Sequence, residues 1–223
     1  MGGSMPKQFL RLGGQPIILH SLRILQSSSV IDEIILAVPQ SDMEYCLTKI
    51  VTPNHFTKVT KIVPGGPERQ DSVRHALEEV HKDVDVVLVH DAVRPFLTEH
   101  MVEEVVNVAR AKGAAIIALP MKDTVKQVGA DHVIECTVER RPLWLAQTPQ
   151  AFRRDWLLTA HRKAHGEGVH ATDDAYLVEW CGHPVSVVEG SGENIKVTRP
   201  EDMIIAEAIL ASRVKGVRLQ GEK

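Results

Sequence analysis

Five short runs of aliphatic and β-branched residues recur along this chain, and they constrain its fold more than any other feature. The runs are Ile34–Val38, Val59–Val63, Val86–Val89, Ala114–Leu119 and Val185–Val188. Each run is followed at once by Pro, His or Glu. Continuous apolar runs of this length are typical of strands that are buried on both faces of a parallel sheet.

Helical patterns lie between these predicted strands. Apolar residues repeat at helical spacing in two segments, which contain Val73, Ala76, Leu77 and Val80, and Met101, Val102, Val105 and Val108. Gly113 is expected to end the second helix. Thr198-Arg199-Pro200-Glu201 has the pattern of a capping box and predicts a further helix after it. Alternating strands and helices predict an α/β protein with a doubly wound, mostly parallel sheet.

The segment from Thr124 to Thr148 interrupts this alternation. Its Gly129-Ala130-Asp131 turn lies between two arms that are rich in β-forming residues and have no helical period. This pattern predicts a β-hairpin inserted into the α/β body. Because an isolated hairpin cannot bury both of its faces, we expect the arm to pack on an identical subunit. No linker or repeat divides the chain, so residues 1–223 are predicted to form one domain.

The overall charge and the cysteines exclude several classes of protein. The formal net charge is −3, which provides no general basic field for nucleic acid. Three widely separated cysteines, Cys46, Cys136 and Cys181, favour a reducing compartment over a disulfide framework or a zinc site. No apolar run has the ~20 residues that a membrane helix requires. We therefore expect a soluble, cytoplasmic protein that binds neither nucleic acid nor membranes.

Common catalytic and cofactor motifs are missing from the sequence. There is no G-x-G-x-x-G, no P-loop motif and no G-x-S-x-G, which argues against dehydrogenases, P-loop NTPases and α/β-hydrolases. His161, His165 and His170 lie near helical spacing, but no H-E-x-x-H motif accompanies them. A metal-binding role for these histidines is therefore disfavoured.

The residues that follow the predicted strands are the candidates for function, because ligands of open parallel sheets bind beyond the carboxyl ends of the strands. "PGGPERQDSV" follows Val59–Val63, and its two glycines let the backbone approach a ligand closely. A plain β-turn with Asp71 or Ser72 as helix cap explains this stretch equally well.

"HDAVRP" follows Val86–Val89. There, Asp91 is a candidate Mg²⁺ ligand and Arg94 a phosphate ligand, and the alternative is a simple salt bridge between them.

Further cations follow the last two predicted strands. Lys122, Asp123, Thr124 and Lys126 stand at the root of the hairpin, and its far side contains Arg140, Arg141 and Thr148. "EGSGENIKVTRPED" presents Lys196 just before a capped helix. Each cation alone is more typical of solvated surface. Together, the glycine turns, one aspartate and several cations at strand ends indicate a site for an anionic nucleotide.

Several longer motifs resemble one family. "PKQFL", "GGPERQDSV", "VLVHDAVRPF", "PMKDTVK", "WLAQTPQAF", "TDDA" and "VEGSGENIKVTRPEDM" occur in the order seen in 2-C-methyl-D-erythritol 4-phosphate cytidylyltransferases. The resemblance covers about residues 5–211. It implies a Rossmann-like nucleotidyltransferase fold and a homodimer joined by exchanged β-arms. It also implies transfer of a cytidylyl group from CTP, with Mg²⁺, to methylerythritol phosphate in the non-mevalonate isoprenoid route, with release of pyrophosphate.

The resemblance also implies roles for individual residues. Catalytic roles would fall to Lys7, Arg140 and Lys196. The nucleotide would be bound by Gly65, Gly66, Ser72 and Ala92. The acceptor would be bound by Asp91, Arg94, Thr124 and Thr148, and Asp91 would also bind the metal. Pro67 departs from relatives that have an acidic residue near the base, so that contact is not carried over.

The start of the chain differs from the family pattern. Family members have a first central strand and a glycine-rich loop before the residues that correspond to Met1-Gly2. The resemblance therefore predicts that the natural protein starts further upstream and that this chain lacks its first central strand.

Two other functions stay open at this point. One is a ribitol- or pentitol-phosphate cytidylyltransferase, and the other is an inactive, truncated dimer module. A sugar-1-phosphate nucleotidyltransferase is disfavoured by the motifs around Asp91 and Lys196.

Overall fold

A computed structural model describes residues 6–214 of this chain. Met1-Gly2, before which the resemblance predicts a first central strand, lies outside the described residues. The strands are β1 (Arg11–Leu12), β2 (Gln15–Pro16), β3 (Ile34–Val38), β4 (Val59–Pro64), β5 (Val86–Val89), β6 (Ala114–Pro120), β7 (Val125–Val128), β8 (Ile134–Val138), β9 (Trp144–Arg153) and β10 (Ser186–Glu189).

Helices alternate with these strands for most of the chain. The α-helices are α1 (Ile17–Ser27), α2 (Met43–Tyr45), α3 (Arg69–Glu78), α4 (Glu99–Lys112), α5 (Arg154–Glu167), α6 (Asp174–Trp180) and α7 (Pro200–Val214). Shorter helical turns are η1 (Lys7–Phe9), η2 (Gln40–Asp42), η3 (Cys46–Val51) and η4 (Thr52–Asn54). The predicted α/β class is therefore confirmed.

The main sheet has the strand order β10-β6-β9-β5, and β3 and β4 form a separate parallel pair. β10 runs parallel to β6, whereas β9 is antiparallel to both of its neighbours, β6 and β5. Consequently β10, β6 and β5 point the same way, and their carboxyl ends meet at one edge. This edge is where the sequence places "HDAVRP" and the loop after β10.

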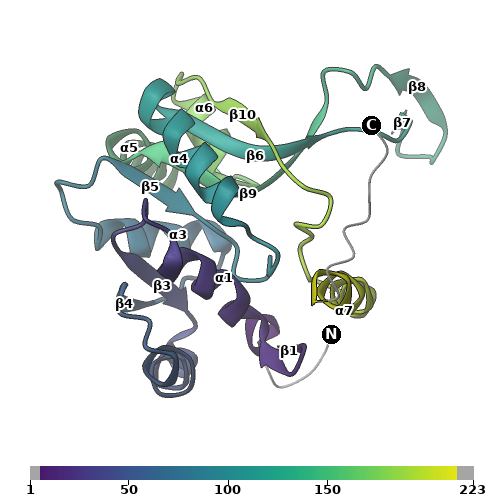
Figure 1. Ribbon diagram of the computed structural model, residues 1–223. Helices are drawn as coiled ribbons and strands as arrows, with labels where there is room; N and C mark the ends of the chain where they lie inside the picture. Colours follow the sequence, from purple (N-terminus) through teal and green to yellow (C-terminus); the bar gives the residue numbers. More distant parts are fainter. Residues whose placement is uncertain (1–5, 215–223) are drawn as a thin grey trace.

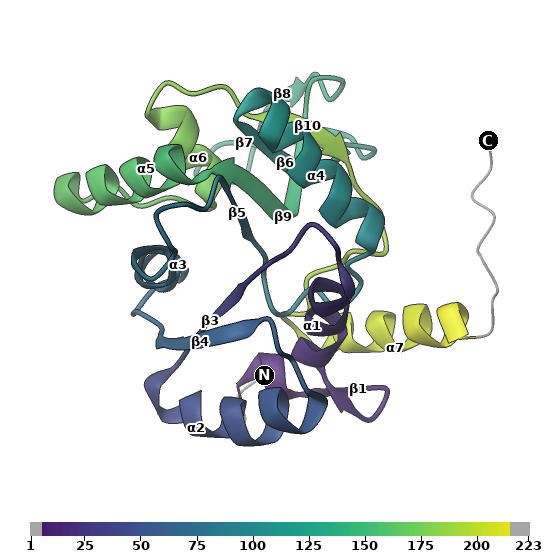
Figure 2. The same ribbon diagram turned by 60° about the vertical axis from the view of Figure 1, so that its left-hand side comes forward.

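Both faces of β6 are buried, as its unbroken apolar sequence predicts. Ala115 and Ile117 pack into the core cluster that contains α4, whereas Ala114 and Ile116 pack into the cluster that contains α5 and α6. Figures 1 and 2 show α4 on one side of the sheet and α5 and α6 on the other. Alternate residues of β6 therefore face opposite sides of the sheet, and each side is covered by a layer of helices, as in a doubly wound fold.

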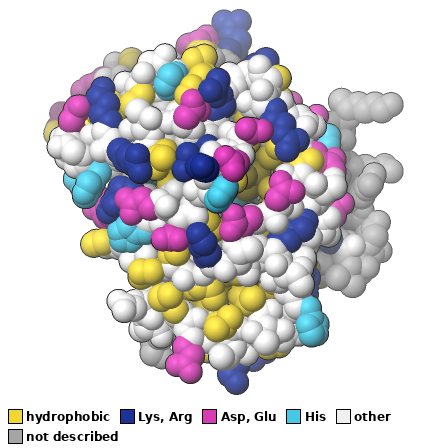
Figure 3. Space-filling view, turned by 90° about the vertical axis from the view of Figure 1, so that its left-hand side faces the viewer, with side chains coloured by type: hydrophobic (Ala, Val, Ile, Leu, Met, Phe, Trp, Pro, Cys, Tyr) yellow, Lys and Arg dark blue, Asp and Glu magenta, His cyan; other side chains and the backbone are white. Residues whose placement is uncertain are grey.

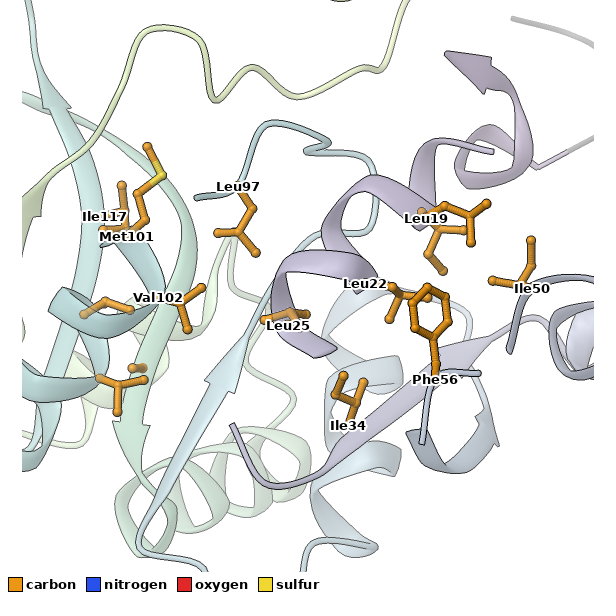
Figure 4. Packing of buried hydrophobic residues seen from close by; sticks show 14 of the residues in the cluster. Leu19, Leu22, Leu25, Ile34, Ile50, Phe56, Leu97, Met101, Val102 and Ile117 are labelled. Atoms are coloured by element: carbon orange, nitrogen blue, oxygen red, sulfur yellow. The ribbon is translucent and has the colours of Figure 1, made fainter. Parts of the chain in front are cut away.

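A second part of the core lies around α1. Figure 4 shows Leu22 and Leu25 of α1 close to Ile34 of β3 and to Phe56, which follows η4. The same cluster continues through Leu97 to α4. Because α1 packs on both β3 and α4, it connects the β3–β4 pair with the main sheet.

A cavity of about 670 Å³ separates β3 from β5. In residues 6–214 no strand pairs with the facing edges of these two strands. The cavity is lined by residues along the whole of β3 and β5 and by apolar side chains of α1 and α3 on its two faces. All four β5 residues are only half-buried, although the sequence predicts full burial. The described fold therefore lacks a strand between β3 and β5, as the resemblance predicts.

Most predicted elements have bounds close to those expected, and the starts of β10 and α7 need correction. β10 begins at Ser186 instead of Val185, because Ser186 is the first residue that pairs with β6, opposite Ala115. The capping carboxylate of α7 is Asp202, which accepts hydrogen bonds from the N–H groups of Thr198 and Arg199 at 2.8 Å each. The box starts one residue later than the sequence predicts because α7 begins at Pro200, a favoured first helical residue.

The predicted hairpin is present as β7 and β8, which pair on either side of the expected turn at Gly129. Its far side differs from the prediction, because Trp144 pairs with Pro120 and already belongs to β9. Figure 1 shows β7 and β8 standing away from the α/β body. The last residues of the predicted arm, from Trp144 onward, therefore belong to β9, a long strand of the main sheet.

A strand placed in the gap should stabilise the fold. Gln8 lines the gap, so a short apolar strand joined through a glycine-rich loop to the N-terminal side of the chain can reach it. We expect such an extension to raise the melting temperature by about 4 °C or more, since 1 kcal/mol corresponds to ~2–4 °C at this size. Amide hydrogen exchange should slow in β3 and β5. An identical extension with two prolines in the strand is the control, and equal effects of both extensions would contradict this prediction.

Candidate functional site

Asp91 lies two residues beyond the carboxyl end of β5 and is contacted by cations from three chain segments. Its Oδ1 atom accepts a hydrogen bond from Nε of Arg69 at 2.8 Å. Its Oδ2 atom lies 2.8 Å from Nζ of Lys196 and 3.9 Å from Nε of Arg94. Only 11% of the Asp91 side chain is exposed. Arg69 comes from the start of α3, Arg94 from the loop after β5, and Lys196 from the loop after β10.

The turn after β5 fixes the direction of Asp91. Its backbone N–H donates to Oγ1 of Thr148 at 3.0 Å, and the N–H of Arg94 donates to the Asp91 carbonyl at 2.9 Å. The guanidinium of Arg94 then donates to the carbonyl of Asn194 at 2.7 Å. These contacts connect the loop after β5 with β9 and with the loop after β10.

Asn194 holds the loop that carries Lys196, and it was not recognised from the sequence. Its side chain is fully buried, and Nδ2 donates to the carbonyl of Thr148 at 2.9 Å and to Oε1 of Gln147 at 3.2 Å. A buried amide with satisfied donors is a strong positional constraint. The signal available in the sequence was an asparagine directly after the Gly192-Glu193 turn.

The surrounding charges keep Asp91 ionised. Burial alone would raise the pKa of this carboxyl, but Arg69 and Lys196 outweigh burial and lower the pKa to about 2. Burial lowers the pKa of the Arg94 guanidinium from its usual value, although Asp91 opposes that shift. At neutral pH the site therefore contains a charged aspartate with three cations around it.

His90 supports the same turn as a neutral ring. Burial lowers the pKa of His90 to about 4. Its Nε2 atom lies 3.2 Å from the carbonyl of Arg94, and Nδ1 lies 3.2 Å from Oγ1 of Thr148. Because a carbonyl only accepts, the neutral ring carries its proton on Nε2. Thr148 thus contacts both His90 and the backbone of Asp91, and its role in placing Asp91 follows from these bonds.

The glycine turn after β4 packs closely against the start of α3. The N–H of Gly65 donates to the carbonyl of Val38 at 2.7 Å, and the N–H of Gly66 donates to Oγ of Ser72 at 3.0 Å. A Cβ atom on Gly66 would lie 2.2 Å from Cβ of Asp71. Asp71 also accepts from the N–H of Glu68 at 3.3 Å, so Glu68 and Asp71 form the helix cap and Ser72 braces the turn.

Some of the predicted site residues line the cavity, and others do not. Ser72, Asp91, Ala92 and Lys196 line the cavity between β3 and β5 at its carboxyl end, together with Arg69 and Gln8. Lys7 is exposed next to Gln8. Thr124 and Arg140 are exposed at the base of the arm, where Arg140 donates to the carbonyl of Lys122. Among the described residues, neither of these two contacts the Asp91 cluster.

Comparison with known proteins shows to which family the chain belongs. The family model for 2-C-methyl-D-erythritol 4-phosphate cytidylyltransferase matches residues 1–212. The chain belongs to this family. The cytidylyltransferase of Syntrophus aciditrophicus is 49% identical to it over 210 residues, which are 94% of this chain and 90% of that protein. A second relative, from Pelotomaculum thermopropionicum, is 46% identical over 213 residues, 96% of this chain and 90% of that protein.

Solved structures of cytidylyltransferases have the same fold. The 4-diphosphocytidyl-2C-methyl-D-erythritol synthase of Anaerococcus prevotii superposes with a TM-score of 0.85 at 31% identity, covering 94% of this chain and 92% of that one. The enzyme of Thermus thermophilus superposes with a TM-score of 0.79 at 34% identity, covering 92% of this chain and 94% of that one. This cytidylyltransferase family is one of nucleotidyltransferases, so the chain has the expected fold and enzyme class.

The glycine turn provides a direct test of the nucleotide side. Gly66→Ala should weaken CTP binding by about tenfold or more, because the new Cβ atom displaces either the turn or Asp71. The measurement is calorimetric titration with CTP, together with thermal melting. The control is Gly166→Ala in α5, where a Cβ atom meets nothing within 4 Å and should leave CTP affinity unchanged. Equal CTP affinities of the two variants would show that the turn does not contact the nucleotide.

Proposed function

We propose that this chain transfers the cytidylyl group of CTP to 2-C-methyl-D-erythritol 4-phosphate, with release of pyrophosphate. The observation that carries the proposal is the cluster of Arg69, Arg94 and Lys196 around Asp91, in a chain that belongs to the family of this activity. The product would enter the non-mevalonate route to isoprenoid precursors.

The chemistry explains why cations gather at this edge. An oxygen of the acceptor phosphate attacks the α-phosphorus of CTP in line, and the bond to the bridging oxygen of pyrophosphate breaks. No general base is required, because a phosphate monoester with a second pKa of about 6 is already largely dianionic at pH 7. The two anionic substrates repel each other, and Arg94 and Lys196 are placed to offset that repulsion. Donors fixed beside the reacting phosphorus stabilise the charge that grows on its oxygens.

The two substrates are proposed to use different walls of the site. Gly65, Gly66 and Ser72 present backbone and hydroxyl groups at the start of α3, where a nucleotide base and ribose can approach closely. Ala92, in the loop after β5, also lines the cavity with a small side chain. Lys7 is proposed to contact the triphosphate. Thr124 and Arg140 are proposed to contact the acceptor bound by a second subunit, because they lie on the arm.

Mg²⁺ is proposed to bind together with the triphosphate of CTP. The described residues contain no group of three or more His, Cys, Asp or Glu side chains that could hold a metal ion. Both oxygens of Asp91 are engaged by cations, so Asp91 would bind a metal through Oδ2 after Lys196 moves away. Phosphate oxygens would then supply most of the ligands, with Asp91 as a carboxylate ligand. The ion would neutralise charge on the phosphate oxygens.

The arm is the proposed dimer contact. It exposes large apolar side chains on both of its strands and at the start of β9, namely Val128, Val133, Ile134, Trp144 and Leu145. Contiguous exposed apolar residues are typical of interaction sites. A second copy of the chain that exchanges its arm would cover them and would complete each site with Thr124 and Arg140.

Nucleic acid and membranes are not among the proposed partners. Lys and Arg side chains intermingle with Asp and Glu over the face shown in Figure 3, which does not resemble a basic surface for nucleic acid. In the described part of the chain, none of the helices combines the length and apolar character of a membrane span. A cytoplasmic location is also proposed, because Cys46, Cys136 and Cys181 are free cysteines, as is usual in a reducing compartment.

Product formation tests the proposal. With CTP and Mg²⁺, the chain should release pyrophosphate with methylerythritol phosphate and far more slowly with ribitol 5-phosphate. Lys196→Ala should lower turnover at saturating CTP by about 10²–10³-fold, as expected for a lost transition-state donor. Lys163→Ala is the control, because Lys163 lies over Trp180 of α6 instead of at Asp91. Absence of product from the unmodified chain, or a Lys196→Ala rate within about twofold of it, would contradict the proposal.

Dimerisation can be tested separately. Ile134→Glu should convert a dimer to a monomer, because it places a charge within the apolar surface of the arm. Light scattering after gel filtration measures the mass of the particle. Ile204→Glu is the control, since Ile204 is 73% exposed on α7, away from the arm. A monomeric unmodified chain, or a dimer that persists in Ile134→Glu, would overturn the proposed contact.

A further inference from the structure

A line of ion-paired and hydrogen-bonded side chains runs from Asp91 into the protein interior. Nε of Arg69 donates to Oδ1 of Asp91 at 2.8 Å. Nη1 of the same guanidinium lies 2.8 Å from Oδ2 of Asp174, at the start of α6. Nε2 of His161, on α5, lies 2.9 Å from Oδ1 of Asp174. Arg69 therefore bridges two carboxylates, and the second carboxylate is itself held by a histidine.

The inner pair of this line is almost completely enclosed. The side chain of His161 is 0% exposed and that of Asp174 is 1% exposed. Nδ1 of His161 has no hydrogen-bond partner among the described residues. A buried carboxylate is unfavourable unless its charge is compensated. Neither residue touches the space where substrates are proposed to bind, so their effect has to act through Arg69.

The charges of the line support each other. Burial alone would raise the pKa of Asp174, but the hydrogen bond from His161 and the charge of Arg69 lower it, so this carboxyl stays ionised. Burial opposes the charge of Arg69, yet Asp174 and Asp91 outweigh that effect and raise its pKa. Arg69 and the two carboxylates of Asp91 and Asp174 thus keep one another in the charged state that the contacts require.

The three cations on Asp91 differ in how firmly they are held. Lys196 is 40% exposed, and Asp91 is its only ion-pair partner among residues 6–214. Arg94 lies 3.9 Å from Asp91, which is beyond hydrogen-bond distance. Arg69 alone has a carboxylate on each side at 2.8 Å. The guanidinium of Arg94 is held by the carbonyl of Asn194 at 2.7 Å. An arriving phosphate can therefore attract Lys196 at lower cost than Arg69, and can attract Arg94 without breaking a hydrogen bond to Asp91.

We infer that Asp174, oriented by His161, is a positioning residue that keeps Arg69 on Asp91 while Lys196 and Arg94 turn to the phosphorylated acceptor. Asp91 then retains one fixed partner throughout the reaction and does not become an unpaired, partly buried charge. This inference deepens the proposed function and rests on it for the identity of the acceptor. It adds Arg69, Asp174 and His161 to the residues on which acceptor binding depends.

Kinetics of the full chain provide the first test. Asp174→Asn keeps the size of the side chain but removes the charge that holds Arg69. We expect the KM for methylerythritol phosphate to rise about tenfold or more, while the KM for CTP stays within about twofold. His161→Gln, which keeps a donor near Asp174, should raise the same KM by a smaller factor. Asp155→Asn is the control, because Asp155 pairs with Arg153 on the exposed start of α5.

A spectroscopic readout tests the inference without turnover. The Nε–H group of Arg69 should give a slowly exchanging signal in a nitrogen-15 proton spectrum, and Arg69→Lys identifies that signal by its loss. Asp174→Asn should broaden or remove the signal, whereas Asp155→Asn should leave it in place. If the unmodified chain forms no product, the proposed function is wrong. The Arg69 signal would still test whether Asp174 positions Arg69. An unchanged signal in folded Asp174→Asn, or equal loss of affinity for both substrates, would overturn the inference.

Discussion

The carboxylate of Asp91 is the point on which the rest of the site depends. It joins Arg69 of α3, Arg94 of the loop after β5 and Lys196 of the loop after β10. These segments are far apart in sequence, and their cations would repel one another without a negative charge between them. A single aspartate at a strand end therefore assembles the charges that two phosphorylated substrates require. The low pKa of Asp91, about 2, keeps that charge present at any physiological pH.

The same edge of the sheet explains how substrates can approach. β10, β6 and β5 end together, and the loops that follow them are joined by Asn194 and Thr148. The cavity between β3 and β5 opens toward this cluster. Because both strands present a free edge to the cavity, the rigidity of the site depends on how that gap is filled. Packing of α1 against β3 and α4 is what holds the two sheets together in the described residues.

Much of this arrangement could be predicted from the sequence, because parallel sheets have a strong local signature. Ile34–Val38 and Val86–Val89 have the bounds that their apolar runs predict, and the glycine after α4 adopts a positive φ of 96° as a helix end. Asp91 and Lys196 were candidates because they follow predicted strands, and the structure brings them within 2.8 Å of each other. Arg69, Asp174 and Asn194 could not be found in this way. Their roles depend on contacts between distant segments, and a single arginine, aspartate or asparagine at a helix start or in a turn has several ordinary explanations.

A crystal structure of the chain with methylerythritol phosphate would test the central claim most directly. The account predicts that the acceptor phosphate lies between Lys196 and Arg94, within hydrogen-bond distance of both. It also predicts that Arg69 still bridges Asp91 and Asp174. A phosphate bound away from these two cations, or an Arg69 side chain that has left Asp91, would contradict the account.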